Sequence, residues 1–272
     1  MSSVVQSVQA DDALLTVEGL TITAPGGPRP IVDALSFSIA KGETLAVVGE
    51  SGAGKSMTGL AILGLVPTPL RVTAGRIDWR GRDLLKVGER ELRALRGNEI
   101  GLVFQEPTAA VNPAVKVGAQ IEEVIRVHLG LDRRTARARA IAAMDRVRIA
   151  DAARRFHAYP HELSGGMLQR VAIAIAIACE PDLLIADEPT TALDASVQRG
   201  VLELLAEIQD AAGTAMLFIT HNLALVAEMA DRVLVMRDGR EVEQANVFAL
   251  FEHPQNTYTR ELLAASPKNL KH

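Results

Sequence analysis

A glycine-rich loop in the first quarter of the chain limits what this sequence can fold into more than any other segment does. The loop reads Gly49-Glu50-Ser51-Gly52-Ala53-Gly54-Lys55-Ser56. The apolar residues 44–48 before it predict a buried strand, and residues 57–63 after it predict a helix. A strand, a glycine loop and a helix in this order are typical of a phosphate-binding turn. A glycine-rich turn without a ligand would leave the flanking strand and helix unexplained.

The chemistry of this loop suits a nucleoside triphosphate. Glycines let successive backbone N–H groups converge on phosphate oxygens, and the start of the following helix adds unpaired N–H groups and a positive dipole end. We expect Lys55 to reach the β- and γ-phosphates and the Ser56 hydroxyl to bind Mg²⁺.

Composition predicts a globular protein of some size without a general affinity for nucleic acid. The chain has 272 residues, of which 48% are hydrophobic and 23% charged, which is enough apolar material for a large core. Its net charge of -4 gives no overall attraction for nucleic-acid phosphates, so we expect no nucleic-acid partner. A single cysteine, Cys179, allows no internal disulfide.

The sequence predicts a protein that stays inside the cell. Residues 1–6 have neither the basic end nor the apolar segment of a secretory signal. The best apolar run, residues 171–178, is far shorter than the roughly 20 residues that cross a bilayer. We therefore expect any contact with a membrane to go through a partner protein.

Hydrophobic patterning predicts an α/β fold with a second, antiparallel sheet. Residues 14–22 and 31–40 alternate partly around a Pro-Gly-Gly-Pro turn, which favours an antiparallel pair, and residues 75–81 add a short strand. The buried strands 183–186 and 216–219 are separated by a helical segment, 196–211, as in a parallel sheet.

The chain divides into four segments on these patterns. We expect residues 1–11 to be a flexible tail and residues 12–106 to hold the first part of the nucleotide-binding core with the antiparallel sheet. Residues 107–179, in which glycine and proline become sparse, predict an inserted helical subdomain. Residues 180–272 would complete the core and add a C-terminal segment.

Two adjacent acids follow the buried strand at residues 183–186. Acidic side chains at the carboxyl end of a parallel strand project into the ligand crevice. Asp187 could hold Mg²⁺, usually through water, and Glu188 could orient or deprotonate the water that attacks the γ-phosphate. Alone, such a pair would more often be an exposed strand end. Together with the glycine loop it predicts hydrolysis.

A second anion site is predicted just ahead of an apolar, alanine-rich helix. Ser164, Gly165 and Gly166 offer a hydroxyl, open backbone and a helix N-terminus to phosphate oxygens. In isolation, these three residues would more often be an ordinary N-capped helix start than an anion site. Their place along the chain favours the functional interpretation.

The order of these segments resembles that of ATP-binding cassette (ABC) transport ATPases over nearly the whole chain. Residues 49–56 resemble the Walker A loop, Gln105 the Q-loop glutamine, residues 163–167 the signature, residues 183–188 the Walker B strand, residues 192–194 the D-loop, and His221 the H-loop histidine. Within that family the chain is most similar to ATPases of bacterial importers for dipeptides, oligopeptides and nickel. The resemblance implies a P-loop NTPase core with an antiparallel side sheet and a helical insert.

The resemblance also implies how the enzyme would work. Family ATPases dimerise head to tail, so Ser164, Gly165 and Gly166 would serve the nucleotide of a second ATPase subunit, identical or related. Gln105 would touch Mg²⁺ or the attacking water, and His221 would contact the γ-phosphate and position Glu188. The implied ligands are ATP and Mg²⁺. The implied partners are membrane-spanning permease subunits, with an extracytoplasmic solute-binding protein acting indirectly, so the chain would lie at the cytoplasmic face of the membrane.

One feature common in the family is missing, and several alternatives stay open. Where the family usually stacks adenine on an aromatic side chain, this sequence has Ala24. The transported solute could be a peptide, nickel or another small molecule, because other subunits select it. A soluble cassette ATPase acting on DNA or ribosomes is the alternative from another class, and a P-loop kinase is a weaker one. Soluble cassette ATPases usually add a long coiled coil, a second cassette or a basic surface, and the sequence shows no sign of these features. A kinase would leave the signature and His221 without a purpose.

Overall fold

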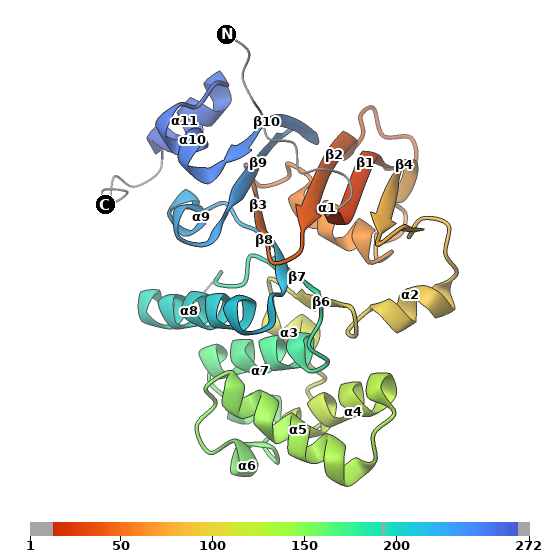
Figure 1. Cartoon of the computed structure of the whole chain (residues 1–272), viewed down its shortest axis with the longest axis vertical. Helices are drawn as coiled ribbons and strands as arrows, with labels where there is room; N and C mark the ends of the chain where they lie inside the picture. Colours follow the sequence, from red (N-terminus) through yellow and green to blue (C-terminus); the bar gives the residue numbers. More distant parts are fainter. Residues whose placement is uncertain (1–12, 192–193, 266–272) are drawn as a thin grey trace. The chain divides into compact units, whose positions relative to one another are not determined.

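The computed structural model describes residues 13–191 and 194–265, and it divides the chain into two compact units. Unit 1 comprises residues 1–88 and 220–272, and unit 2 comprises residues 89–219. The flexible tail predicted at residues 1–11 lies outside the described residues. Figure 1 gives the labels of the elements that follow.

Unit 1 contains the predicted antiparallel sheet. Its strands, in the spatial order β2-β1-β4-β5, are β2 (Val32–Ala40), β1 (Ala13–Thr23), β4 (Arg71–Trp79) and β5 (Arg82–Asp83). β1 pairs with β2 on one side and with β4 on the other, and Leu15 lies opposite both Ile39 and Trp79. All three side chains are fully buried, so the alternation in the sequence marks the core face of this sheet. The antiparallel pair predicted from residues 14–22 and 31–40 is confirmed.

Unit 1 also contains the strand that leads into the glycine loop. β3 (Thr44–Val48) pairs in parallel with β9 (Arg232–Arg237), which pairs in the antiparallel sense with β10 (Arg240–Asn246). All five residues of β3 are buried, which explains why its sequence is apolar from Leu45 to Val48. The helices of this unit are α1 (Lys55–Ile62), α9 (Leu223–Met229), α10 (Val247–Glu252) and α11 (Thr257–Ala265). α10 and α11 lie beside β10 (Figure 1).

Unit 2 contains three parallel strands in the order β8-β7-β6. They are β8 (Ala215–Ile219), β7 (Leu183–Asp187) and β6 (Ile100–Val103). β7 is central, with Ile185 opposite both Leu102 and Leu217. The predicted parallel arrangement of residues 183–186 and 216–219 is confirmed, with helix α8 (Ala195–Ala212) in the connection between the two strands.

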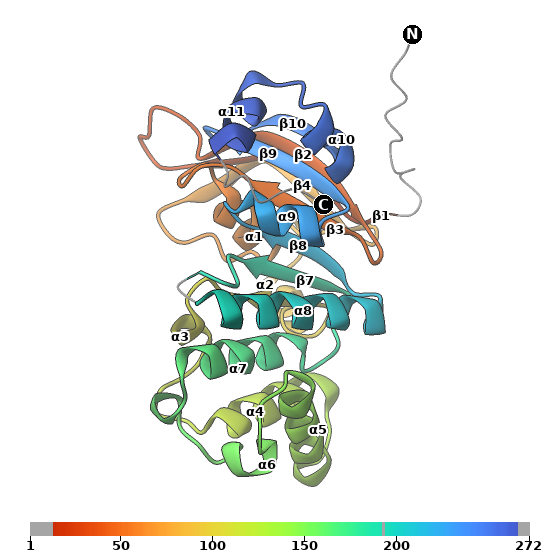
Figure 2. The ribbon, with the colours of Figure 1, turned by 90° about the vertical axis from the view of Figure 1, so that its left-hand side faces the viewer.

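The remaining elements of unit 2 are helices, and the composition of residues 107–179 predicts all of them except the first, which lies at residues 89–95. Its elements are α2 (Glu89–Leu95), α3 (Pro107–Ala110), α4 (Val117–Leu129), α5 (Arg133–Arg146), α6 (Ala152–Arg155), the short 3-10 helix η1 (Pro160–Glu162) and α7 (Gly165–Ile177). Figures 1 and 2 both show α7 between α8 and the pair α4 and α5. Eight of the thirteen residues of α7 are buried, so this apolar helix forms the centre of the helical part.

Candidate functional site

The glycine loop of unit 1 has the backbone that a phosphate cradle needs. Gly49, Gly52 and Gly54 all have positive φ angles, of 152°, 86° and 95°. A Cβ on Gly49 would lie 2.2 Å from the carbonyl oxygen of Met236, and one on Gly54 would lie 2.6 Å from that of Ile31. Only glycine therefore fits at these two positions, because both the backbone angle and the space exclude a side chain.

Helix α1 begins at Lys55, so the lysine and Ser56 belong to its first turn. The sequence predicts a helical start only after Ser56, and the difference arises because Gly54, in a left-handed conformation, already provides the N-cap. The Lys55 side chain is 6% exposed, and its Nζ donates hydrogen bonds to the carbonyl oxygens of Gly49 at 2.8 Å and Glu50 at 2.9 Å. The ammonium group is thus folded back over the loop.

His221 follows β8 and belongs to unit 1. The preceding residue, Thr220, donates its backbone N–H to the carbonyl oxygen of Val47 at 3.2 Å, which places His221 near the end of the strand that leads into the glycine loop. Asn222 then caps α9 by accepting the N–H of Ala224 at 3.0 Å. His221 is exposed at this strand-to-helix turn, so its ring is accessible to a ligand.

A contact that the sequence does not predict joins the glycine loop to the C-terminal helix of unit 1. The hydroxyl of Tyr258, in α11, accepts a hydrogen bond from the backbone N–H of Glu50 at 3.3 Å. Burial raises the pKa of Tyr258, so its hydroxyl stays protonated at neutral pH. No local sequence pattern indicates this contact, since the two residues are 208 positions apart.

In unit 2 the two predicted acids lie at the end of β7. Asp187 is the last residue of the strand, and Glu188 follows with a positive φ of 47°, an uncommon backbone conformation for a non-glycine residue. The Glu188 carboxylate accepts a hydrogen bond from the Thr191 hydroxyl at 2.6 Å, and its backbone N–H donates to the carbonyl oxygen of Ile219 at 2.9 Å. Backbone and side chain of Glu188 are therefore both fixed.

Gln105 and the signature residues are also in unit 2. Gln105 is exposed in the bend between β6 and α3. Ser164 is the N-cap of α7, where its Oγ accepts the backbone N–H of Met167 at 3.4 Å, and Gly165 begins the helix. A Cβ on Gly166 would lie 2.7 Å from Cγ1 of Val197 in α8. The serine therefore acts as a helix cap, and the second glycine is required by packing.

The D-loop is described only at its last residue. Ala192 and Leu193 lie outside the described residues, whereas Asp194 is the N-cap of α8. Its Oδ1 accepts hydrogen bonds from the hydroxyl and backbone N–H of Ser196 and from the N–H of Val197. The bond from the Ser196 hydroxyl is the largest cause of the lowered pKa of Asp194.

The donor set fits Mg²⁺ bound together with a triphosphate rather than a metal held by protein alone. Within the described residues, no group of three or more His, Cys, Asp and Glu side chains could hold a metal ion. Mg²⁺ in nucleotide sites usually takes one or two protein oxygens and completes its shell with phosphate and water. The Ser56 hydroxyl in unit 1 and the Asp187 carboxylate in unit 2 are each an oxygen donor of this kind.

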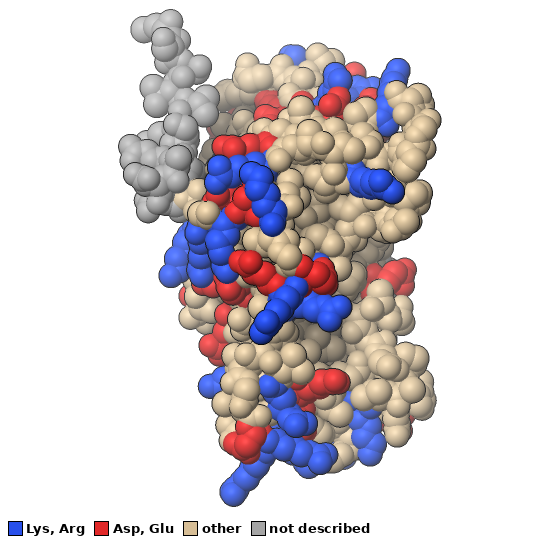
Figure 3. All heavy atoms as spheres, turned by 90° about the vertical axis from the view of Figure 1, so that its right-hand side faces the viewer, with Lys and Arg blue, Asp and Glu red and all other residues tan. Residues whose placement is uncertain are grey.

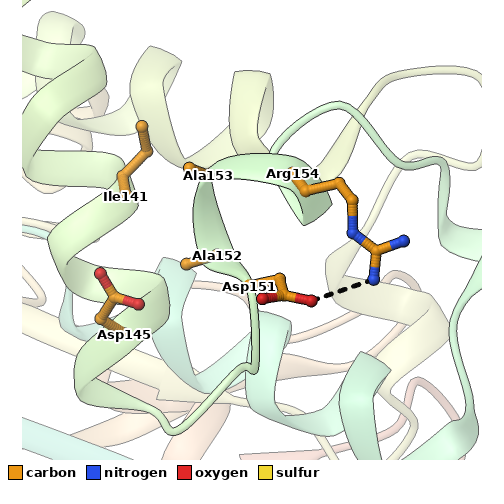
Figure 4. Close-up of a pocket in the computed structure, with 6 residues that line it drawn as sticks. All are labelled: Ile141, Asp145, Asp151, Ala152, Ala153 and Arg154. Atoms are coloured by element: carbon orange, nitrogen blue, oxygen red, sulfur yellow. Dashed lines mark hydrogen bonds and ion pairs between the residues drawn. The ribbon is translucent and has the colours of Figure 1, made fainter.

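A hollow of about 440 Å³ in the helical part of unit 2 does not suit a nucleotide. It is lined by Ile141, Asp145 and residues 151–154 (Figure 4). Its charged groups are the Asp145 carboxylate and an ion pair between Asp151 and Arg154 at 3.1 Å, so it offers little positive charge to a triphosphate. None of the predicted site residues lines it.

The mixture of charges on one face of the molecule agrees with the charge balance of the sequence. On the face shown in Figure 3, lysines and arginines are interspersed with aspartates and glutamates, and no broad basic field dominates that face. In the part of the chain that the structure describes, no helix has the length and apolarity needed to span a membrane.

Comparison with known proteins supports the same interpretation. The family model described as ABC transporter matches residues 32–191. The dipeptide transport ATP-binding protein DppD of Escherichia coli is 48% identical over 94% of this chain and 79% of its own length. A putative peptide import ATP-binding protein of Brucella abortus is 47% identical over 93% of this chain and 77% of its own length.

Solved structures agree on the fold. CbiO1 of Clostridium perfringens, part of the ABC transporter complex CbiONQ, is 30% identical with a TM-score of 0.75, covering 89% of this chain and 92% of its own. The dimeric, post-hydrolysis structure of the ATP-binding cassette MJ0796 bound to ADP and Pi is 26% identical with a TM-score of 0.76, covering 86% and 98%. The expected P-loop NTPase fold is confirmed, and the chain belongs to the ABC transporter family.

Proposed function

We propose that this chain is the ATP-hydrolysing subunit of an importer that takes up peptides. ATP hydrolysis follows from membership of the family. Peptide as the solute is supported chiefly by the 48% identity, over 94% of the chain, to a dipeptide transport ATP-binding protein. Nickel import is the alternative, because the solute is selected by other subunits. A soluble cassette ATPase has no support beyond the shared motifs.

In this proposal the glycine loop binds the phosphates, and a set of oxygen donors binds Mg²⁺. The backbone N–H groups of residues 49–56 and the Lys55 ammonium bind the phosphates, and the left-handed glycines keep the loop open to them. The Mg²⁺ ligands that the family resemblance implies are Ser56, Asp187 and Gln105, and the bound ion would neutralise charge on the β- and γ-phosphate oxygens.

Glu188 is proposed to orient and deprotonate the attacking water. Its hydrogen bond from Thr191 fixes the carboxylate, and its left-handed backbone is the kind of strain that functional residues often carry. His221 is proposed to contact the γ-phosphate. Ser164, Gly165 and Gly166 are proposed to bind the nucleotide of a second ATPase subunit, identical or related, as the head-to-tail dimer of the family implies. In such a dimer, ATP would stabilise the closed state more than ADP does, because the signature residues add contacts to the γ-phosphate.

The assignment of Glu188 is tested by Glu188→Gln, which keeps the size of the side chain and removes its charge. We expect MgATP binding to be retained and turnover to be lost. Glu252→Gln, the same change at an exposed position at the end of α10, should leave both unchanged and serves as the control. Full hydrolysis by Glu188→Gln would remove this residue from the catalytic machinery.

The permease is proposed to bind the helical part of unit 2 at a hollow of about 470 Å³ with charges of both signs. The hollow is lined by Lys116, Ala119, Glu122, Glu123, Arg126, Arg133, Arg137, Phe156 and His157. Glu122, only 6% exposed, pairs with Arg133 at 3.4 Å, while the Arg137 guanidinium lies over the Phe156 ring at 4.8 Å. Fixed charges in a concave surface suit recognition of a protein loop.

Charge reversal tests this surface. Arg126→Glu should weaken copurification with the permease subunits while leaving ATP binding by the isolated chain unchanged. Arg90→Glu, on the exposed surface of α2, is the matched control and should copurify normally. Equal copurification of both variants with wild type would exclude the hollow as the docking surface.

The solute is tested in the assembled complex. Peptide-loaded binding protein should raise the ATP turnover of the reconstituted importer, at the cytoplasmic face of the membrane, above that with empty binding protein. Stimulation by nickel-loaded protein instead would replace peptide with nickel as the solute. Isolation of the chain with ribosomes or DNA, and without any permease, would contradict a transport role.

A further inference from the structure

The start of helix α11 is held firmly on strand β10 in unit 1. The Glu243 carboxylate accepts the backbone N–H groups of Gln255 at 2.7 Å and Asn256 at 3.0 Å. The Asn256 side chain accepts the N–H of Tyr258 at 2.9 Å and donates to the carbonyl oxygen of Val242 at 3.2 Å. Four hydrogen bonds thus fix the backbone immediately before Tyr258, which leaves this residue little freedom to move.

The Tyr258 side chain extends from α11 and packs against the end of β9. It is 5% exposed, and the Arg237 guanidinium lies over its ring at 4.6 Å. The residue next to Arg237, Met236, provides the carbonyl oxygen against which Gly49 packs. The end of β9 therefore touches both the tyrosine ring and the first glycine of the loop.

The hydroxyl of this fixed tyrosine reaches the glycine loop at Glu50. Its oxygen accepts the Glu50 N–H at 3.3 Å, and the carbonyl oxygen of the same peptide unit, that of Gly49, accepts a hydrogen bond from Lys55 Nζ at 2.8 Å. The Gly49–Glu50 peptide is therefore held at its carbonyl oxygen by the phosphate-binding lysine and at its N–H by Tyr258. A change in this peptide's orientation would move the Gly49 carbonyl oxygen, one of the two that Lys55 must leave when it turns to a phosphate.

We propose that Tyr258 is a positioning residue for the phosphate-binding loop: its hydroxyl sets the orientation of the Gly49–Glu50 peptide and thereby the affinity of the loop for MgATP. This inference rests on the proposed role of residues 49–56 in nucleotide binding. It gives the C-terminal helix α11 a direct influence on the nucleotide site, although the helix itself contributes no ligand.

Tyr258→Phe tests the proposal because it removes only the hydroxyl and keeps the ring under Arg237. The loss of one hydrogen bond of ordinary strength predicts an increase of about two- to tenfold in the Kd and KM for MgATP. The kcat should stay unchanged, since Tyr258 touches none of the groups assigned to catalysis. Tyr159→Phe removes the only other tyrosine hydroxyl, in unit 2, and is the matched control, expected to bind MgATP as wild type does.

Calorimetric titration of the purified full chain with MgATP, together with urea unfolding without nucleotide, separates the outcomes. A raised Kd in Tyr258→Phe alone supports the positioning role. An unchanged Kd with a lowered unfolding midpoint would show that Tyr258 only stabilises the fold, and would overturn the inference. Absence of MgATP binding by wild type would overturn the proposed function as well, whereas normal binding by wild type and Tyr258→Phe alike would overturn only the role of the tyrosine.

Discussion

Replacement of Gly54 by alanine tests the view that the shape of the glycine loop is imposed by its neighbours. Gly54 has a φ of 95°, and a Cβ there would lie 2.6 Å from the Ile31 carbonyl oxygen and 3.0 Å from Cγ2 of Val32. Gly52, in the same loop, has a φ of 86°, but a Cβ there would meet no atom within 4 Å. The two glycines thus share the backbone requirement and differ in the space around them.

The expected costs follow from this difference. Gly52→Ala should lower the free energy of unfolding by about 1–2 kcal/mol, the cost of a left-handed backbone at a residue with a Cβ. Gly54→Ala adds a clash with a backbone carbonyl that cannot turn away, worth about 1–3 kcal/mol more, for a total of about 2–5 kcal/mol.

Urea unfolding followed by tryptophan fluorescence measures both variants. Trp79 is the only tryptophan of the chain and is fully buried in β4 of unit 1, the unit that holds the loop, so it reports this unit alone. Gly54→Ala should unfold at clearly lower urea than Gly52→Ala. Equal unfolding midpoints for the two variants, or a Gly54→Ala protein as stable as wild type, would refute the proposed steric clash at position 54.

Three further predictions concern other parts of the chain. Asp132 is the N-cap of α5, and its Oδ1 accepts the N–H groups of Arg134 and Thr135. Asp132→Ala should therefore lower the free energy of unfolding of unit 2, measured in urea, by about 1 kcal/mol. An unchanged free energy of unfolding would contradict the capping role. Burial raises the pKa of the Cys179 thiol to about 11, so maleimide should react slowly at pH 7 and faster as the pH rises or urea unfolds the chain; rapid reaction at neutral pH would contradict this. Because Ala24 stands where the family usually has an aromatic residue, the kcat/KM of wild type for ATP should exceed that for GTP only slightly. Ala24→Tyr should increase this preference for ATP. A strong preference for ATP in wild type would show that adenine is bound by residues other than Ala24.

The elements that the sequence predicts are those that depend on local patterning. β3 has no exposed residue, so its apolar run is continuous from Leu45 to Val48, whereas β1 alternates only in part between buried and more exposed residues. The glycine loop is recognisable because its positive φ angles demand glycine at fixed positions. These features can be predicted from the sequence because residues that are adjacent in the chain determine them.

The details that the sequence does not predict depend on residues far apart or on backbone conformations without a residue signal. Nothing about a glutamate indicates the left-handed φ of Glu188, and its bond from Thr191 is visible only in the fold. The requirement for glycine at position 166 comes from Val197 in another helix, and the contact of Tyr258 with Glu50 joins opposite ends of the chain. Contacts of this kind need the folded structure.

Calorimetric titration with MgATP, of wild type beside Lys55→Ala, tests the account most directly. Lys55 is the buried ammonium group that the loop holds next to its phosphate cradle. We predict saturable binding by wild type and a large loss of affinity in Lys55→Ala with the fold intact by urea unfolding. No detectable affinity of wild type for the triphosphate, or equal affinity in the two proteins, would contradict the assignment of this loop as the nucleotide site.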